Sequence, residues 1–170
     1  SQAELTEHKA HLEQLVEART ADLTESQAVE RRKSAIADAI NRVLREALTC
    51  ETEEDVAKIA LQVAEQLTGA AFGFIGEVNA EGTFDTIGLS NPGWDACSID
   101  GGQATLLIRG MELRGIWSDV IRQGTSSIVN EPDQHPTRVG TPEGHPPLTS
   151  FLGVPFRREG RTVGMIALGN

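Results

Sequence analysis

The sequence predicts an α+β fold, in which an antiparallel sheet has helices packed on one side and follows a long N-terminal helix. The first 34 residues contain no Gly and no Pro and are rich in residues that favour helix. Two apolar stripes at helical spacing come next, and then apolar segments at strand spacing, joined by short polar turns. Strands joined by tight turns pair antiparallel, so helices are expected to gather on one side of the sheet.

Length and charge exclude several classes of protein. With 170 residues, the chain is long enough for one domain with a core and an accessory segment. Its formal net charge of -10 argues against nucleic acid or an anionic membrane as a partner, since both are polyanions. No apolar run approaches the roughly 20 residues that span a bilayer. Cys50 and Cys97 form no CxxC pair, which is typical of a reducing compartment, and we expect the protein in the cytoplasm.

A heptad frame runs through the predicted N-terminal helix. Apolar residues fall at the a and d positions near both of its ends, which predicts a parallel coiled-coil homodimer. The same stripe continues through residues 35–48. The predicted dimer residues are Leu5, Leu12, Leu15, Val29, Ile36, Ile40 and Val43.

The middle of this seam is polar. Val16 and Leu23 offer a second seam there, one residue out of phase with the first. Two registers in one helix are consistent with a switch element, and equally with a weak coil or a solvated helix. The polar a and d positions are Arg19, Asp22, Ser26 and Lys33.

The remaining elements follow in order along the chain. Thr52 is the expected N-cap of a second helix, with Asp55 in an imperfect capping box, and Gly69 is its expected end. Residues 70–78 and 83–89 are predicted strands, and residues 90–102 a loop. A short strand is expected at 105–108, a helix at 115–123 ending at Gly124, and a strand at 126–130.

A long loop and a closing hairpin complete the chain. Residues 131–147 contain five of the seven prolines and two of the four histidines. The segment 144–156 then enters one apolar strand, a charged turn covers 157–161, and a second apolar strand runs through 162–170.

These last residues, Gly-His-Pro-Pro-Leu-Thr-Ser-Phe-Leu-Gly-Val-Pro-Phe and the strand that follows, resemble the closing hairpin of a GAF domain, a small sensory module of bacterial signalling proteins. The order of elements across 35–170 matches that family. The resemblance implies a signalling helix over 1–34, continuing into 35–48, and a GAF domain over 35–170. Such domains usually close with a C-terminal helix, which we expect to be missing here.

Residues 16–23, Val-Glu-Ala-Arg-Thr-Ala-Asp-Leu, resemble the linker helices of histidine kinases. The resemblance implies a regulatory domain that binds a small ligand and passes the change through a dimeric helix. A ligand-free dimerisation and relay module is the alternative. Neither a phosphoacceptor box nor an ATP-binding half is present, so the chain itself is not expected to be an enzyme, and any kinase activity would lie in further sequence.

His145 is the candidate metal ligand. It precedes Pro146 and Pro147 in a segment that resembles the GAF domains of heme-based redox and oxygen sensors, where such a histidine is the proximal heme ligand. A histidine on a proline-stiffened loop is suited to that role. Where these sensors carry an aromatic hydroxyl on the last strand, this chain has Ala167, and it has no Tyr. Heme is therefore one alternative cofactor, and the cofactor is otherwise unknown.

The resemblance places a ligand pocket between the sheet and the variable loops. Cys97 is followed by Ser98 rather than by the His of bilin-binding GAF domains, and the cyclic-nucleotide signature of the family is absent. Two distant cysteines also argue against the methionine sulfoxide reduction that some lone GAF domains perform. The candidate pocket residues are Trp94, Cys97, Ile116, Trp117, His135, His145 and Phe151.

Overall fold

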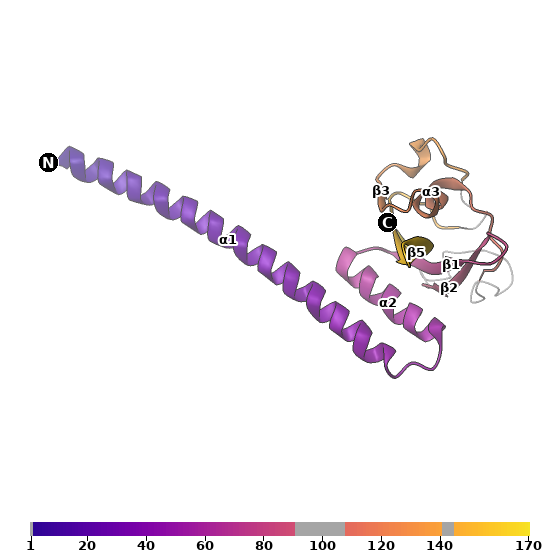
Figure 1. Ribbon diagram of the computed structural model, residues 1–170. Coiled ribbons are helices and arrows are strands. Elements are labelled where there is room, and N and C mark those ends of the chain that lie inside the picture. Colours follow the sequence, from indigo (N-terminus) through magenta and orange to yellow (C-terminus); the bar gives the residue numbers. More distant parts are fainter. Residues whose placement is uncertain (1, 91–107, 141–144) are drawn as a thin grey trace. The chain divides into compact units, whose positions relative to one another are not determined.

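The computed structural model describes residues 2–90, 108–140 and 145–170 (Figure 1). Within these residues the strands form one antiparallel five-stranded sheet in the order β2-β1-β5-β4-β3. The predicted α+β class and antiparallel sheet are confirmed. The elements are α1 (Gln2–Ala47), α2 (Glu53–Thr68), β1 (Phe72–Val78), β2 (Phe84–Leu89), α3 (Gly115–Gln123), β3 (Ser127–Val129), the 3-10 turn η3 (Pro132–Gln134), β4 (Phe151–Arg158) and β5 (Arg161–Gly169).

Helix α1 is a single unbroken helix of 46 residues that has no buried residue. The chain divides into two compact units, residues 1–42 and 43–170, so most of α1 is a unit by itself. Apart from Val43, its large apolar side chains are exposed, from Ile36 at 41% to Leu5 at 68%. In the described part of the chain, no helix has both the length and the apolar character needed to cross a bilayer.

Helix α2 begins and ends at the residues that the sequence predicts. The Thr52 hydroxyl accepts the Asp55 N–H at 3.1 Å and donates to the Asp55 carboxylate at 2.6 Å. Gly69 ends the helix in the left-handed conformation at φ 76°, and its N–H bonds to the Glu65 carbonyl. Ala57, Leu61 and Val63 are its buried residues, so one stripe of α2 faces the domain interior.

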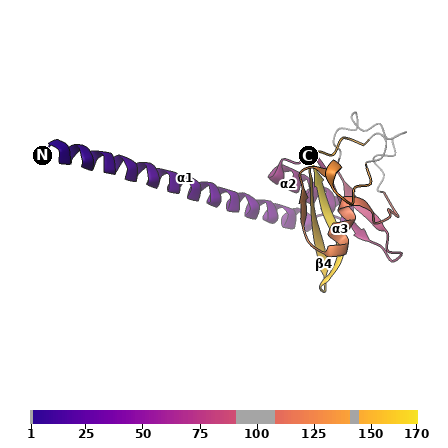
Figure 2. The ribbon, with the colours of Figure 1, turned by 90° about the horizontal axis from the view of Figure 1, so that it is seen from above.

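The two faces of the sheet carry different helices. A Cβ on Gly88 would lie 2.7 Å from the Ala57 Cβ, so α2 lies directly on strand β2. A Cβ on Gly153 would lie 2.7 Å from a Val120 methyl of α3. A Cβ on Gly73 would lie 3.2 Å from a Leu61 methyl of α2. Successive residues of a strand point to opposite faces, and the register puts Gly73 and Gly153 on opposite sides. The sheet therefore lies between α2 and α3, as Figures 1 and 2 show.

The main core lies between α3 and the sheet. Phe84 and Met165 are 0% exposed, and Val120 of α3 is 1% exposed. Buried apolar area of this kind is the main favourable term in folding. The buried members of this cluster are Phe84, Ile116, Val120, Ile121, Phe151, Met165 and Ala167.

The hairpin of β4 and β5 closes through Glu159 and Gly160. Both residues have positive φ, 52° and 80°. Two successive positive φ values define the tight turn whose twist matches that of the paired strands. The register runs from Arg158 paired with Arg161 to Phe151 paired with Gly169, so the predicted closing hairpin is confirmed.

Helix α3 spans the predicted residues, and Gly124 ends it at φ 64°. The structure does not confirm the short strand expected at 105–108. Residues 105–107 lie outside the described residues, and Ile108 is not in a strand. Instead Met111 forms an isolated bridge with Phe84, so the residues after Ile108 follow the edge of β2.

Candidate ligand-binding end of the sheet

Several loops meet at one end of the sheet. Gly169, the last residue of β5, pairs with Phe72 at the start of β1 and with Phe151 at the start of β4. Leu89, the last residue of β2, pairs with Phe74 of β1. The segments that flank these strands, residue 90 and residues 145–150, therefore leave the sheet at the same end as Asn170.

Asn170 holds the proline-containing loop against the end of β5. Its side-chain carbonyl accepts the backbone N–H of Thr149 at 2.8 Å and of Ser150 at 3.4 Å. Its side-chain amide donates to the Pro147 carbonyl at 2.7 Å. The Asn170 backbone has φ 61°, and Asn is among the residues that adopt this region most readily. One side chain thus fixes the loop on both sides of Leu148.

His145 lies at the beginning of this fixed loop and is half-buried. Its ring contacts Phe72 edge-on, with centroids 5.6 Å apart and an interplanar angle of 80°. Nδ1 lies 2.7 Å from the Pro146 carbonyl oxygen. Because a carbonyl only accepts, Nδ1 is the donor of this hydrogen bond, and in a neutral imidazole Nε2 is then the nitrogen with the lone pair. An imidazole in this tautomer is able to accept a hydrogen bond or bind a metal through Nε2.

Both flanks of the segment 91–107 are anchored to the sheet. On one side the Ser90 hydroxyl accepts the Gly73 N–H at 2.6 Å, and the Ser90 N–H donates to the Gly73 carbonyl at 2.9 Å. On the other side the Ile108 N–H donates to the Thr86 hydroxyl at 2.7 Å. The predicted pocket residues Trp94 and Cys97 lie between these anchors and outside the described residues.

Asp85 of β2 supports the second anchor. Its carboxylate accepts the Gly110 N–H at 2.7 Å and the Asn79 amide at 3.1 Å, and Arg109 lies 3.5 Å away. These groups lower the pKa of Asp85, and the bond from the Gly110 N–H makes the largest contribution. Asp85 thus joins the β1–β2 turn to the segment that leads to α3.

Three of the predicted pocket residues lie together on the α3 face of the sheet. Ile116 and Phe151 are 9% and 6% exposed and belong to the buried core. The Trp117 ring packs against Phe84 at 5.1 Å and against Phe74 at 6.3 Å between centroids. These side chains fill the described part of this face by contacting one another, and their role as ligand contacts stays a prediction.

His135 belongs to a different cluster, which fixes the loop after η3 to α3. The Thr137 hydroxyl donates to the Asp119 carboxylate at 2.6 Å. His135 Nδ1 lies 3.0 Å from the same hydroxyl oxygen and 3.4 Å from the Thr137 backbone nitrogen, so this ring nitrogen contacts Thr137 through both groups. Among the described residues, His135 and His145 contact different partners and not each other, so the structure does not bring these two candidates together.

Sequence reasoning missed the residues that hold the loops. Asn170, Ser90 and Asp85 each bond to a partner that is distant along the chain, up to 25 residues for Asp85 and Gly110. Local patterns carry no signal for such partners. The only available hint was the residue type, since Asn, Ser and Asp are the residues that most often bond to the backbone near turns.

Comparisons with known proteins agree with this architecture. A family model of the GAF domain matches residues 50–170. The GAF domain of a phosphoenolpyruvate-protein phosphotransferase (ptsP) from Coxiella burnetii has a TM-score of 0.65 and 13% identity, covering 81% of this chain and 78% of that chain. The A. aeolicus nlh2 GAF domain in an inactive state has a TM-score of 0.60 and 16% identity, covering 82% and 81%.

A free methionine-R-sulfoxide reductase from Neisseria meningitidis, solved in complex with its substrate, has a TM-score of 0.58 and 14% identity, covering 79% of this chain and 72% of that chain. Identities this low support the fold alone. No curated protein sequence matches the chain. The GAF family model covers well over half of the 170 residues, and the chain therefore belongs to the GAF domain family.

Proposed function

We propose that the chain is the signalling helix and GAF domain of a cytoplasmic bacterial sensor protein, a histidine kinase. GAF domains are in general regulatory modules that bind small ligands, and family membership supports this part of the proposal. The ligand would bind where residues 90 and 145–150 leave the sheet. The chain itself would be regulatory and not catalytic.

The observation that carries the proposal is the exposed apolar stripe of α1. Residues 2–38 of α1 are all exposed, so this part of the helix gains little from tertiary packing, which supplies most helical stability in proteins. Leu12, Leu15 and Val29 are each about half exposed, at 47%, 49% and 47%. A second copy of the helix, packed in parallel along the heptad seam, would bury these side chains.

Signal transfer would follow from loop ordering. A ligand bound at the loop end would favour one arrangement of residues 131–147 and so one packing of the last turns of α1. It shifts this equilibrium only by the difference in its affinity for the two states. The two registers of the polar middle of α1 supply the two states of the output helix.

Sedimentation equilibrium of the full chain tests the dimer. We expect wild type to be dimeric and Ile40→Asp to be monomeric, because the substitution puts a charge at an a position of the seam. Ile40→Leu is the matched control and should remain dimeric. An Ile40→Asp protein that sediments as a dimer would show that the seam is wrongly assigned.

A ligand-free relay module is the second candidate. The packing of Trp117 against Phe74 and Phe84 favours it, because these rings occupy space beside the sheet. In that case the domain would only dimerise and relay a signal. A screen of small metabolites by thermal shift distinguishes a ligand-binding domain from a relay module. Trp117→Ala, which alters the same face of the sheet, is screened alongside wild type. A ligand that raises the melting temperature of wild type rules out a module that only relays.

The heme alternative depends on His145. The Nε2 of its imidazole fits an axial iron ligand, and heme bound there would supply redox or gas sensing. The Ala167 side chain is buried and offers no hydrogen-bond donor on the last strand. An absorption spectrum with added hemin tests this. A sharp Soret band that is lost in His145→Ala supports heme, and a band indifferent to His145 excludes this ligand.

A further inference from the structure

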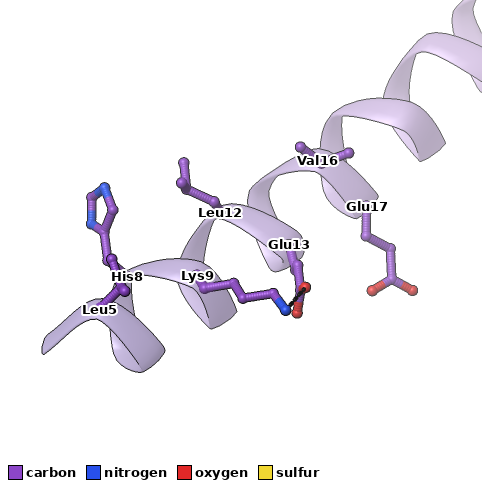
Figure 3. Close-up of a pocket in the computed structure, with 7 residues that line it drawn as sticks. All are labelled: Leu5, His8, Lys9, Leu12, Glu13, Val16 and Glu17. Atoms are coloured by element: carbon purple, nitrogen blue, oxygen red, sulfur yellow. Dashed lines mark ion pairs between the residues drawn. The ribbon is translucent and has the colours of Figure 1, made fainter. Parts of the chain in front are cut away.

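The first turns of α1 carry a shallow groove of their own. Figure 3 shows His8, Leu12 and Val16 on one side of the helix, beside the ion pair of Lys9 and Glu13. Leu5, at 68% exposed, and Val16, at 63%, leave the groove open to solvent. It is lined by Leu5, His8, Lys9, Leu12, Glu13, Val16 and Glu17.

The heptad frame gives His8 a special place in this groove. With Leu5 and Leu12 at a positions and Leu15 at a d position, His8 occupies the d position between the two leucines. In a parallel dimer, each d residue meets the same residue of the other helix. Two imidazoles would therefore face each other between two leucine layers.

We propose that this groove binds the same groove of a second copy in parallel, and that the paired His8 layer makes the association pH-dependent. The inference rests on the dimer of the proposed function. It adds the orientation of the two helices at this end, the residue at the centre of the contact, and a condition that weakens it.

Charge complementarity selects a second copy as the occupant. Glu4 falls at a g position and Lys9 at the following e position. In a parallel dimer these positions of opposite helices are neighbours, so Glu4 of each copy lies beside Lys9 of the other. An antiparallel pair would place neither these charges nor the two His8 residues together.

The charged groups around His8 set the sign of the effect. On its own helix, Glu4 lies one turn before it and His11 one turn after it; across the seam lie His8 and Lys9 of the second copy. Burial in the seam and the two facing cations disfavour a protonated His8, while Glu4 favours it. The two imidazoles lie in the seam, whereas Glu4 and Lys9 flank it as an oppositely charged pair, so burial and the facing imidazole decide the sign. Histidine ordinarily gains its proton near pH 6.5, so association should be strongest above that pH and weaken below it.

Sedimentation velocity of the full chain at pH 7.5 and pH 5.5, at constant ionic strength, tests the inference. We expect the dimer dissociation constant to rise about 10-fold or more at pH 5.5, because most imidazoles of the free chains are then protonated and two of them must lose a proton for each dimer that forms. His8→Gln, which cannot titrate, should abolish this rise. His11→Gln is the matched control and should keep it.

The outcomes separate this inference from the proposed function. A dimer of equal strength at both pH values, or a pH response that persists in His8→Gln and disappears in His11→Gln, would overturn the His8 layer and leave the dimer in place. A wild-type chain that is monomeric at pH 7.5 would overturn both. Circular dichroism at each pH checks that α1 and the domain remain folded.

Discussion

Residues 1–42 and 43–170 use apolar side chains in opposite ways. In the domain, Phe84, Met165 and Val120 are no more than 1% exposed, and they pack against one another. In α1, Leu5, Leu23 and Ile40 are each more than half exposed. The domain therefore has a core of its own, whereas the apolar stripe of α1 lies open to solvent over residues 2–38.

Because of this contrast, the two units should respond to different variables. The stability of a core depends on what is buried within the chain. The stability of an exposed stripe depends on the concentration of a partner that covers it. Substitutions in the core should therefore change unfolding at any protein concentration, whereas substitutions in the stripe should change association.

The greatest loss of stability is expected at the centre of the domain core. Phe84→Ala removes a ring that is 0% exposed and contacts both Phe74 and Trp117, and should cost about 3–5 kcal/mol of unfolding free energy. Urea unfolding followed by tryptophan fluorescence measures it. Leu23→Ala, at a side chain that is 59% exposed, is the control and should leave the domain transition unchanged. Equal losses from both variants would contradict the contrast between the two units.

A more moderate loss is expected at the loop end of the sheet. Asn170→Ala removes the acceptor of the Thr149 N–H and the donor to the Pro147 carbonyl, and should cost about 1–2 kcal/mol. Hydrogen exchange should accelerate at Thr149 while the amides of β5 keep their protection. Asn170→Asp, which retains the acceptor alone, should fall between Ala and wild type. Unchanged exchange at Thr149 in Asn170→Ala would show that the loop is held by other contacts.

A still weaker effect concerns acid stability through Asp85. Its pKa is lowered in the folded domain, chiefly by the Gly110 N–H, so its contribution to stability is present above the unfolded value of about 3.9 and is lost as the pH falls below it. Asp85→Asn should therefore lose less stability than wild type between pH 6 and pH 3. Asp133→Asn, at a carboxylate that is 89% exposed, is the control for the removal of one surface charge. A wild-type slope in Asp85→Asn would refute the role of this carboxylate.

The elements that were predictable from the sequence are those fixed by local chemistry. Thr52 begins its helix as expected, and Gly69 and Gly124 end theirs, because caps depend on neighbouring residues. The arrangement around the candidate site was not predictable in the same way. The resemblance implied a pocket that includes Ile116 and Phe151, but it carried no information on how closely the side chains around them pack. The role of Asn170 depends on a loop more than 20 residues away.

The anchors at Ser90 and Ile108 have a consequence for how such a domain diversifies. Each flank of the 91–107 insertion is hydrogen-bonded to a strand residue, Gly73 on one side and Thr86 on the other. Because the entropy of closing a loop grows only slowly with its length, the segment between two such anchors can be exchanged at low cost to the scaffold. We therefore expect that a different loop can be grafted between these two anchors and that the core of Phe84 and Met165 stays in place.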